Sequence, residues 1–412
     1  MWLFGTALLK DFMSIMKVKF VVIGAGPAGL SFAAELKRRG EQSFFVLEKE
    51  KKAGGLCRSA IWNDAPVDIG GGHILDKKKK HIIRFLFSYM PECEWDSYER
   101  DSRIAIGDTI VGYPLEANIW QFPLEEQLEY LLSIAATGSV AGKPMPALFT
   151  DWIYWKLGEK IAETYMLPYN RKIWSYDLDA LGTYWLYKLP DVSFRDVLES
   201  CLLRASKGKP PAHGTFYYPK TTGYGEVFLR IADTLKEHMQ YEYAVNTIDC
   251  GSRKINGEIE ADYIINTAPW NEFANSLPFE IQDLVKQLHF TSIDIDCYND
   301  DSYSDKAHWT YYADEKLPYH RIIHRDNIIK GSKGYWTETN SKRRSKPGEF
   351  HYENKYAYPL NTVNKPQVIS DVLKYMERLN IFGLGRWGEW EHMNSDIAIE
   401  RGIQLSERFV RE

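Results

Sequence analysis

One stretch close to the N-terminus constrains the fold more than any other part of the chain. Residues 18–30 read Val-Lys-Phe-Val-Val-Ile-Gly-Ala-Gly-Pro-Ala-Gly-Leu, an apolar run that ends in three spaced glycines. A helical pattern of apolar residues follows, and a second apolar run at 44–47 closes with Glu48. Strand, glycine turn, helix, strand and acid, in that order, are typical of a Rossmann dinucleotide-binding unit. We therefore expect an α/β domain with a parallel sheet.

The residues of this unit have separate expected tasks. Gly24 permits the tight turn, Gly26 lets a pyrophosphate approach the backbone, and Gly29 lets helix and strand pack closely. The helix N-terminus favours the pyrophosphate anion, and Glu48 can hold a pair of ribose hydroxyls. A glycine turn in another kind of αβ unit is the alternative. The expected cofactor contacts here are Gly24, Gly26, Pro27, Ala28, Gly29, Glu48 and Lys49.

Two further glycine clusters follow the second strand. Gly54-Gly55 would let more backbone close on a cofactor, a feature that a nicotinamide-only unit does not need. Residues 70–73, Gly-Gly-Gly-His, indicate backbone crowded against something flat with an imidazole beside it. Taken alone, this second cluster is better interpreted as a glycine-rich hairpin with a structural histidine.

Composition narrows the functional class. The 412 residues are enough for two or three subdomains, and 44% hydrophobic and 26% charged residues are typical of a soluble globular protein. A net charge of −5 argues against nucleic acid and anionic membranes as partners. The five scattered cysteines form no CxxC motif, so we expect no metal site and a reducing, cytoplasmic location. Residues 1–9 do not make a good signal peptide, and no apolar run reaches the length of a membrane span.

The rest of the chain alternates between helical and strand-like patterns. We expect helices at 81–90, 227–238 and 397–409, a mostly helical region from 124 to about 203 that Pro168 interrupts, and a turn-rich stretch at 216–225. A short β ribbon is expected at 103–112 and strands at 243–248 and 261–269, with an antiparallel sheet from 289 to about 358.

In this order, three separate chain segments make up the dinucleotide domain, as is common in flavoproteins that bind an extended FAD. The expected segments are an N-terminal extension (1–16), dinucleotide-binding parts (17–112, 211–275 and 366–412), a helical insertion (113–210) and an antiparallel-sheet substrate domain (276–365).

Several separated blocks together resemble one family. The chain is similar to UDP-galactopyranose mutases, more to the eukaryotic-type branch than to the bacterial one, over about residue 17 to the end. The blocks, in their order and approximate spacing, are the glycine fingerprint with Gly54-Gly55, Gly-Gly-His at His73, Tyr113-Pro114, Pro168-Tyr169-Asn170 with Trp174, Tyr319-His320-Arg321, Tyr358-Pro359 and residues 385–390, Gly-Arg-Trp-Gly-Glu-Trp.

The resemblance implies an unusual use of a flavin. It implies that NAD(P)H or another reductant reduces the FAD. The reduced FAD then interconverts pyranose and furanose forms of a UDP-sugar through an N5–sugar adduct. UDP-galactose is the default substrate, and another UDP-sugar such as UDP-arabinopyranose is conceivable.

Roles carry over residue by residue. The resemblance places His73 beside the flavin, Arg321 on the substrate diphosphate, and the hydroxyls of Tyr311 and Tyr358 on the same diphosphate. The implied substrate contacts are Tyr113, Glu116, Asn170, Trp174, Lys188, Tyr319, His392 and Asn394. Further implied cofactor contacts are Gly55, Leu56, Gly72, Val245, Arg386, Asp396 and Ile397.

Some positions depart from the family pattern. A second diphosphate arginine is replaced by Leu189, for which the neighbouring Lys188 could substitute as a point charge. Glu116 stands for a glutamine that contacts the base, His392 for a tyrosine, and Asn394 for an aspartate of bacterial members. Two alternatives therefore stay open: a net FAD oxidoreductase of the amine-oxidase or protoporphyrinogen-oxidase group, and a flavin-binding protein without catalysis.

Overall fold

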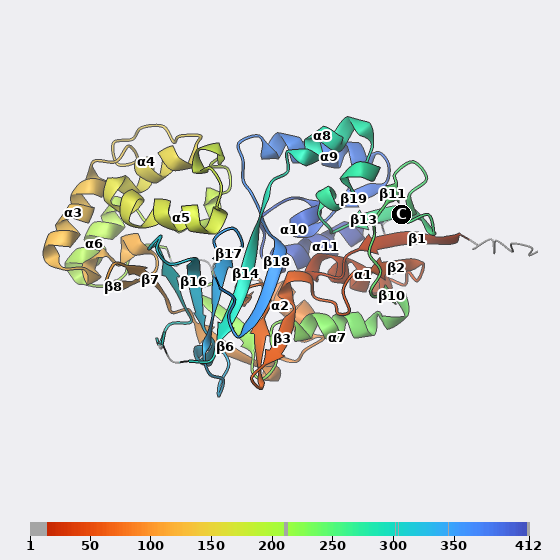
Figure 1. Cartoon of the computed structure of the whole chain (residues 1–412), viewed down its shortest axis with the longest axis horizontal. Helices are drawn as coiled ribbons and strands as arrows, with labels where there is room; N and C mark the ends of the chain where they lie inside the picture. The colour runs from red at the N-terminus through yellow and green to blue at the C-terminus, as the bar shows by residue number, and fades with distance from the viewer. Residues whose placement is uncertain (1–14, 210–212, 301, 304, 345, 410–412) are drawn as a thin grey trace, which may run out of the picture.

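The first sheet joins strands from the start, middle and end of the chain. The computed structural model describes residues 15–209, 213–300, 302–303, 305–344 and 346–409. β1 (Met16–Ile23) lies between β2 (Phe44–Leu47) and β13 (Ile259–Asn266), parallel to both, and β13 also pairs in parallel with β19 (Ile381–Gly383). The sheet is completed by β10 (Met239–Gln240), β11 (Ile248–Asp249) and β12 (Lys254–Ile255). This arrangement confirms the Rossmann-like domain assembled from three segments (Figure 1).

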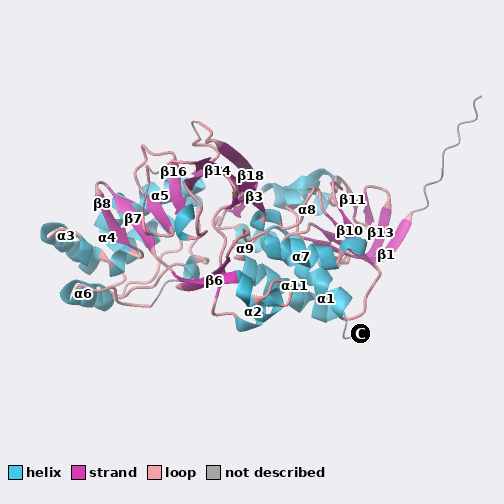
Figure 2. Ribbon diagram, turned by 90° about the horizontal axis from the view of Figure 1, so that it is seen from below, coloured by secondary structure: helices cyan, strands magenta, loops and turns pink. Residues whose placement is uncertain are grey.

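Helices cover both faces of this sheet, which is why its central strand is a continuous apolar run. Phe20 and Val22 pack in one core with α1 (Pro27–Arg38), α7 (Glu226–Thr234) and α11 (Ser395–Phe409). Val21 and Ile23 point the other way, into a core with α8 (Phe279–Lys286) and α9 (Lys365–Glu377). Figure 2 shows α1, α7 and α11 together against the strands. Smaller helices are α2 (Lys80–Phe87) and α10 (Gly385–Gly388).

The second sheet forms the middle of the molecule. Its strand order is β18 (Phe350–Pro359), β14 (Phe290–Tyr298), β17 (Tyr335–Asn340), β16 (Tyr319–His324), β15 (Trp309–Tyr312), β7 (Ser102–Ile106) and β8 (Thr109–Gly112). All neighbours are antiparallel except β15 and β7. Residues 102–112, which we grouped with the first dinucleotide segment, extend this sheet because Ile104 and Val111 are buried under the helical insertion.

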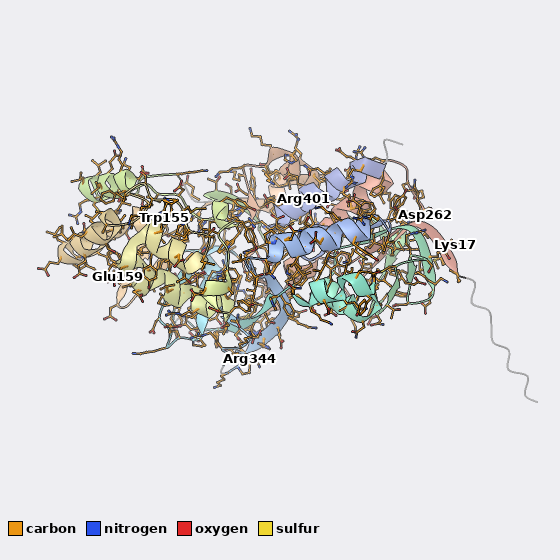
Figure 3. All side chains as sticks on the ribbon, turned by 90° about the horizontal axis from the view of Figure 1, so that it is seen from above. Lys17, Trp155, Glu159, Asp262, Arg344 and Arg401 are labelled. Atoms are coloured by element: carbon orange, nitrogen blue, oxygen red, sulfur yellow. The ribbon has the colours of Figure 1, made fainter. Side chains whose placement is uncertain are left out.

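The helical insertion lies at the end of the molecule away from the first sheet. It contains α3 (Leu124–Ala135), α4 (Phe149–Ile161), α5 (Leu167–Trp174) and α6 (Phe194–Leu203). Figure 3 marks Trp155 and Glu159 of α4 at one end and Lys17 of β1 at the other. The expectation that Pro168 interrupts the helix is wrong, because helical residues continue on both sides of it. A π-helical turn, Ala162–Met166, precedes it, and a proline in the first turn of a helix gives up no intrahelical hydrogen bond.

Three local expectations are corrected. The stretch 216–225 is only partly turn, because β9 (Thr215–Pro219) pairs with β5 (Leu75–Asp76) and β6 (Trp95–Glu99). Residues 243–247 form no strand, since Asn256 Oδ1 accepts the N–H groups of Asn246 and Thr247 in a side-chain-bonded turn. The Gly-Gly-Gly-His cluster follows a hairpin of β3 (Ser59–Trp62) and β4 (Ala65–Asp68) instead of forming one.

Of the predicted extension, residues 1–14 lie outside the described residues, and Met16 already belongs to β1. Within the described ranges, no helix is both long enough and apolar enough to cross a membrane.

Candidate active site

Two cavities meet in the centre of the molecule. One, of about 360 Å³, is lined by the glycine turn and the ends of the parallel strands. The other, of about 500 Å³, lies between the second sheet and the helical insertion. We call them the dinucleotide cavity and the second cavity. Their walls share four residues: His73, Arg386, Asn394 and Ser395.

Glycine backbone forms a tight cradle in the dinucleotide cavity. A Cβ on Gly55 would stand 3.0 Å from Cα of Gly26, so the two glycine loops approach at backbone distance. Gly29 does not line the cavity, because its Cβ would stand 2.1 Å from the carbonyl oxygen of Gly24, where helix and strand pack. The predicted contacts that line this cavity are Gly24, Gly26, Pro27, Ala28, Glu48, Lys49, Gly55, Leu56, Val245 and Arg386.

Glu48 closes one end of the cradle. Its Oε2 accepts the N–H of Ala25 at 2.8 Å and its Oε1 accepts the N–H of Glu50 at 3.0 Å, while burial raises the pKa of the carboxyl group. Each carboxylate oxygen has a second lone pair, so the backbone bonds orient the group and leave it able to accept from a ribose.

The start of α11 lies at the junction, but Asp396 does not face it. Ser395 and Ile397 line the second cavity, whereas Asp396 is buried and 3.8 Å from the ammonium of Lys79. Asp396 lines neither cavity and lies beside Lys79 instead. The expectation that Asp396 contacts the cofactor is therefore corrected, and Ser395 lies at that wall instead.

His73 stands where the two cavities join. Its Nδ1 lies 2.9 Å from the carbonyl oxygen of Gly71, which fixes the proton on Nδ1 and leaves Nε2 as an acceptor. Removal from bulk water, with a further effect of the positive charge of Arg386, lowers the pKa of His73 to about 4. The side chain is thus a neutral imidazole at pH 7.

Arg321 faces the second cavity and is also one half of an ion pair. Its Nε and Nη2 donate to the carboxylate of Glu338, directly opposite on β17, at 2.5–2.9 Å. Burial opposes both shifts, but the charge of the partner lowers the pKa of Glu338 to about 2 and raises that of Arg321. Because this carboxylate takes one edge of the guanidinium, an anion in the cavity is left with the Nη end.

Aromatic side chains make up most of the remaining wall. Tyr113, Tyr311 and Tyr358 line the cavity together with Asn170 and Trp174. The indole of Trp174 donates to Oδ1 of Asn170 at 2.8 Å, which fixes both side chains. Flat rings with hydroxyl groups at their edges suit a sugar or a nucleobase.

Tyr319 lies outside both cavities, contrary to the expectation that it contacts substrate. The pairing of β16 with β17 shifts register between Tyr319 and Arg321. In a regular strand these two residues would share a face. The bulge turns Tyr319 to the opposite face, where its hydroxyl bonds that of Tyr303 at 2.6 Å.

A second positive charge reaches the cavity from Lys188, beside Leu189. Among the described residues the ammonium of Lys188 has no hydrogen bond or ion pair, and burial lowers its pKa to about 8. His392 lies at the same wall, and burial lowers its pKa far enough to keep it neutral. Asn394 completes this wall, with Nδ2 2.9 Å from Nε2 of His213.

Glu116 is a carboxylate in an otherwise apolar end of the cavity. Trp152, Leu157 and Tyr165 line the same end, and burial raises the pKa of Glu116. When ionised, this side chain can only accept hydrogen bonds, so the group that it meets must donate.

Two residues of the wall, Arg100 and Tyr169, and Glu338 behind it shape the site although no role was predicted for them. Arg100 stacks on the rings of Tyr113 and Trp309, 4.5 and 4.9 Å from their centroids, and its Nη2 donates to the Tyr311 hydroxyl at 3.4 Å. Tyr169 follows Pro168 in one of the resemblance blocks, so its place beside Asn170 was a usable signal. Glu338 lies within the predicted antiparallel sheet from 289 to about 358, and its pairing with Arg321 depends on the strand opposite.

Comparisons with known proteins establish the fold. The family described as NAD(P)-binding Rossmann-like domain matches residues 22–88. Over 80 residues, the chain is 36% identical to the all-trans-retinol 13,14-reductase of Rattus norvegicus, a match that covers 19% of this chain and 13% of that protein. A reduced UDP-galactopyranose mutase has a TM-score of 0.86 at 20% identity over 96% of this chain and 94% of its own.

Two oxidases share the architecture at lower similarity. A putative protoporphyrinogen oxidase from Exiguobacterium sp. 255-15 has a TM-score of 0.72 at 14% identity, covering 97% of this chain and 99% of its own. Cyclohexylamine oxidase from Brevibacterium oxydans IH-35A has a TM-score of 0.67 at 14% identity, covering 96% and 99%. The chain thus has the mixed α/β fold of flavin-dependent enzymes, with a Rossmann-like dinucleotide-binding domain.

Proposed function

We propose that the protein is an FAD-dependent sugar-nucleotide mutase that interconverts pyranose and furanose forms of a UDP-sugar, with UDP-galactose as the default substrate. The observation that carries the proposal is the position of Arg321, on the wall of a cavity that opens at His73 onto the dinucleotide cavity. A diphosphate held there would place the attached sugar towards the junction. NAD(P)H or another reductant would supply the electrons, in the cytoplasm.

The residues present suit FAD. The cradle of Gly26 and Gly55 would be filled by any Cβ, which fits a pyrophosphate at the N-terminus of α1. When bound and reduced, FAD supplies an electron-rich ring nitrogen that can act as the nucleophile towards a sugar. The chain's own residues would hold and orient the substrate around it.

Different residues of the second cavity would bind the diphosphate, donate hydrogen bonds and exclude water. Arg321 and Lys188 would bind the departing diphosphate and stabilise its charge. Tyr311 and Tyr358 would add hydroxyl donors, and the aromatic wall with Trp174 would exclude water from a reactive sugar. His73, neutral and with Nε2 as an acceptor, would hold a hydrogen bond to a donor at the junction.

A net FAD oxidoreductase is the second candidate. It is favoured by the oxidases among the structural neighbours and by the retinol reductase match. It gives no reason, however, for an aromatic cavity in which the ammonium of Lys188 joins the guanidinium groups of Arg100, Arg321 and Arg386.

One experiment separates the two. The FAD-loaded protein is reduced with dithionite under nitrogen and incubated with UDP-galactofuranose or UDP-arabinopyranose, and the products are separated. Oxygen uptake is recorded in a second, aerobic sample without dithionite, because dithionite itself consumes oxygen. We expect an isomeric UDP-sugar and no oxidised product. Continuous oxygen consumption with an oxidised product would favour the oxidoreductase, and no product from any UDP-sugar would contradict the mutase.

A further inference from the structure

Glu338 connects the two cavities through hydrogen bonds. Besides holding Arg321, its Oε1 accepts the backbone N–H of Gly72 at 2.9 Å. A Cβ on Gly71 would stand 2.9 Å from the same oxygen, so the glycine loop rests directly on the carboxylate. The carboxylate side chain is only 1% exposed.

The loop that Glu338 holds carries His73. Residue 73 follows the bonded N–H of Gly72 immediately, and its ring is fixed to the carbonyl of Gly71. Its side chain lines both cavities. A continuous path of hydrogen bonds therefore runs from the guanidinium in the second cavity to the imidazole at the junction.

The carboxylate of Glu338 cannot easily lose either of its hydrogen-bonded partners. A carboxylate accepts both sets of N–H groups, and a buried charge that loses its partner carries a large desolvation penalty. His320 is a further titratable group beside Glu338, with Nε2 3.6 Å from Oε2. A shift of Arg321 towards an anion thus has to be followed by the carboxylate, and through it by Gly72.

We propose that Glu338 is a positioning residue that couples anion binding at Arg321 to the Gly72–His73 loop, so that the redox state of the flavin and the affinity for a nucleoside diphosphate depend on each other. This inference rests on the proposed function only for the presence of FAD and a diphosphate, and it requires no sugar chemistry. Coupling between two sites is reciprocal, so either direction can be measured.

The test compares UDP affinity in the two redox states. Dissociation constants are measured by calorimetry on the FAD-loaded protein, oxidised and then reduced under nitrogen, and UDP-induced flavin difference spectra are recorded. In the wild type we expect the two constants to differ about fivefold or more, the lower bound of common allosteric couplings. In Glu338→Gln we expect a ratio close to one and a weaker difference spectrum at saturating UDP, because an amide carries no charge and has one accepting oxygen instead of two, so it cannot hold the whole guanidinium edge as well as the N–H of Gly72.

A matched control is available in the same sheet. Asp294 on β14 is a buried carboxylate that accepts from Ser341 and lies 3.5 Å from Arg344, away from both cavities. Asp294→Asn should keep the wild-type ratio, which excludes a general effect of removing a buried charge from this sheet. Flavin absorbance per chain verifies that both variants are folded and loaded.

Other outcomes overturn the coupling. Equal constants in the wild type, or an unchanged ratio in Glu338→Gln, would remove Glu338 from this role even if sugars are interconverted. A wild type that binds neither UDP nor inorganic pyrophosphate would overturn it too, because Arg321 would then not be an anion site. A protein with the coupling but no isomerase activity contradicts the proposed function alone.

Discussion

Burial sets the charge of the side chains that face the second cavity. With pKa values of about 4 for His73 and about 8 for Lys188, the wall at pH 7 presents a neutral imidazole and an ammonium, and Glu338, with a pKa of about 2, is a carboxylate behind Arg321. That carboxylate is matched by Arg321, and the arginines of the wall stay protonated, so Lys188 supplies the positive charge that changes near pH 8. A diphosphate ligand should therefore respond strongly to the titration of this one lysine.

We predict that UDP binding weakens as the pH rises through the pKa of Lys188. Below about pH 8 the amine is protonated and attracts the diphosphate, and above it the charge is lost. The dissociation constant should rise about tenfold between roughly pH 7 and 9.5, the scale of one charged hydrogen bond. Lys188→Arg should keep its affinity over the same range, because arginine stays protonated.

The arginine variant also serves as the control for titration of UDP itself. Parallel curves for the wild type and Lys188→Arg would show that Lys188 does not contact the ligand. Burial also lowers the pKa of Lys365 to about 8, but this lysine lines neither cavity and donates to Asn361 and to the carbonyl of Trp390. Its titration should therefore not account for the change in UDP affinity.

Replacement of Arg321 should separate catalysis from cofactor binding. We predict that Arg321→Ala retains FAD, because Arg321 does not line the dinucleotide cavity, and loses nearly all turnover. Arg321→Lys should keep a charge to pair with Glu338 and still lose roughly a hundredfold in kcat/KM, since the planar fork is absent. Flavin absorbance per chain and initial rates of UDP-sugar isomerisation measure the two effects. Normal turnover in either variant would show that Arg321 does not bind the diphosphate.

At the scale of elements, the glycine turn between β1 and α1 combines two tasks that single substitutions can separate. Gly29→Ala would place a Cβ 2.1 Å from the Gly24 carbonyl, so we predict a loss of about 1–3 kcal/mol in the free energy of unfolding. A Cβ on Gly26 would find its nearest neighbour at 3.8 Å and would occupy the cavity instead. Gly26→Ala should therefore fold normally and bind FAD weakly.

Chemical denaturation of the flavin-free proteins and flavin titration check the two substitutions. An equal loss of stability in both variants would contradict the separation of tasks. Gly26→Ala with wild-type FAD affinity would contradict the position of the pyrophosphate.

The same comparison of elements shows what the sequence could predict. Periodicity and glycine spacing identify β1, α1 and β2, because these elements are local and their apolar runs are long. The bulge that turns Tyr319 away from Arg321 leaves no such pattern, since it depends on pairing with β17. Glu338 is likewise defined by the strand opposite it, and Arg100 by two rings that are distant in sequence. Sequence reasoning therefore located the wall of the site better than the contacts within it.

For the whole molecule, the decisive feature is that the second cavity is complete only beside the dinucleotide cavity. Strands from three chain segments build one cavity, and the helical insertion with the second sheet builds the other. The residues of the shared wall come from the glycine loop, from α10 and from the start of α11 with the residue before it. A dinucleotide that fills the first cavity would close this side of the second.

We predict that UDP stabilises the FAD-loaded protein more than the flavin-free protein. A ligand raises the melting temperature according to its affinity for the folded state, and that affinity should fall when the shared wall lacks the dinucleotide. Melting curves by circular dichroism, with and without UDP at one fixed concentration, give the two shifts. Arg321→Ala should abolish the shift in both forms. Equal shifts in the loaded and flavin-free wild type would mean that UDP binds away from the junction, and the second cavity would then have to work independently of the first.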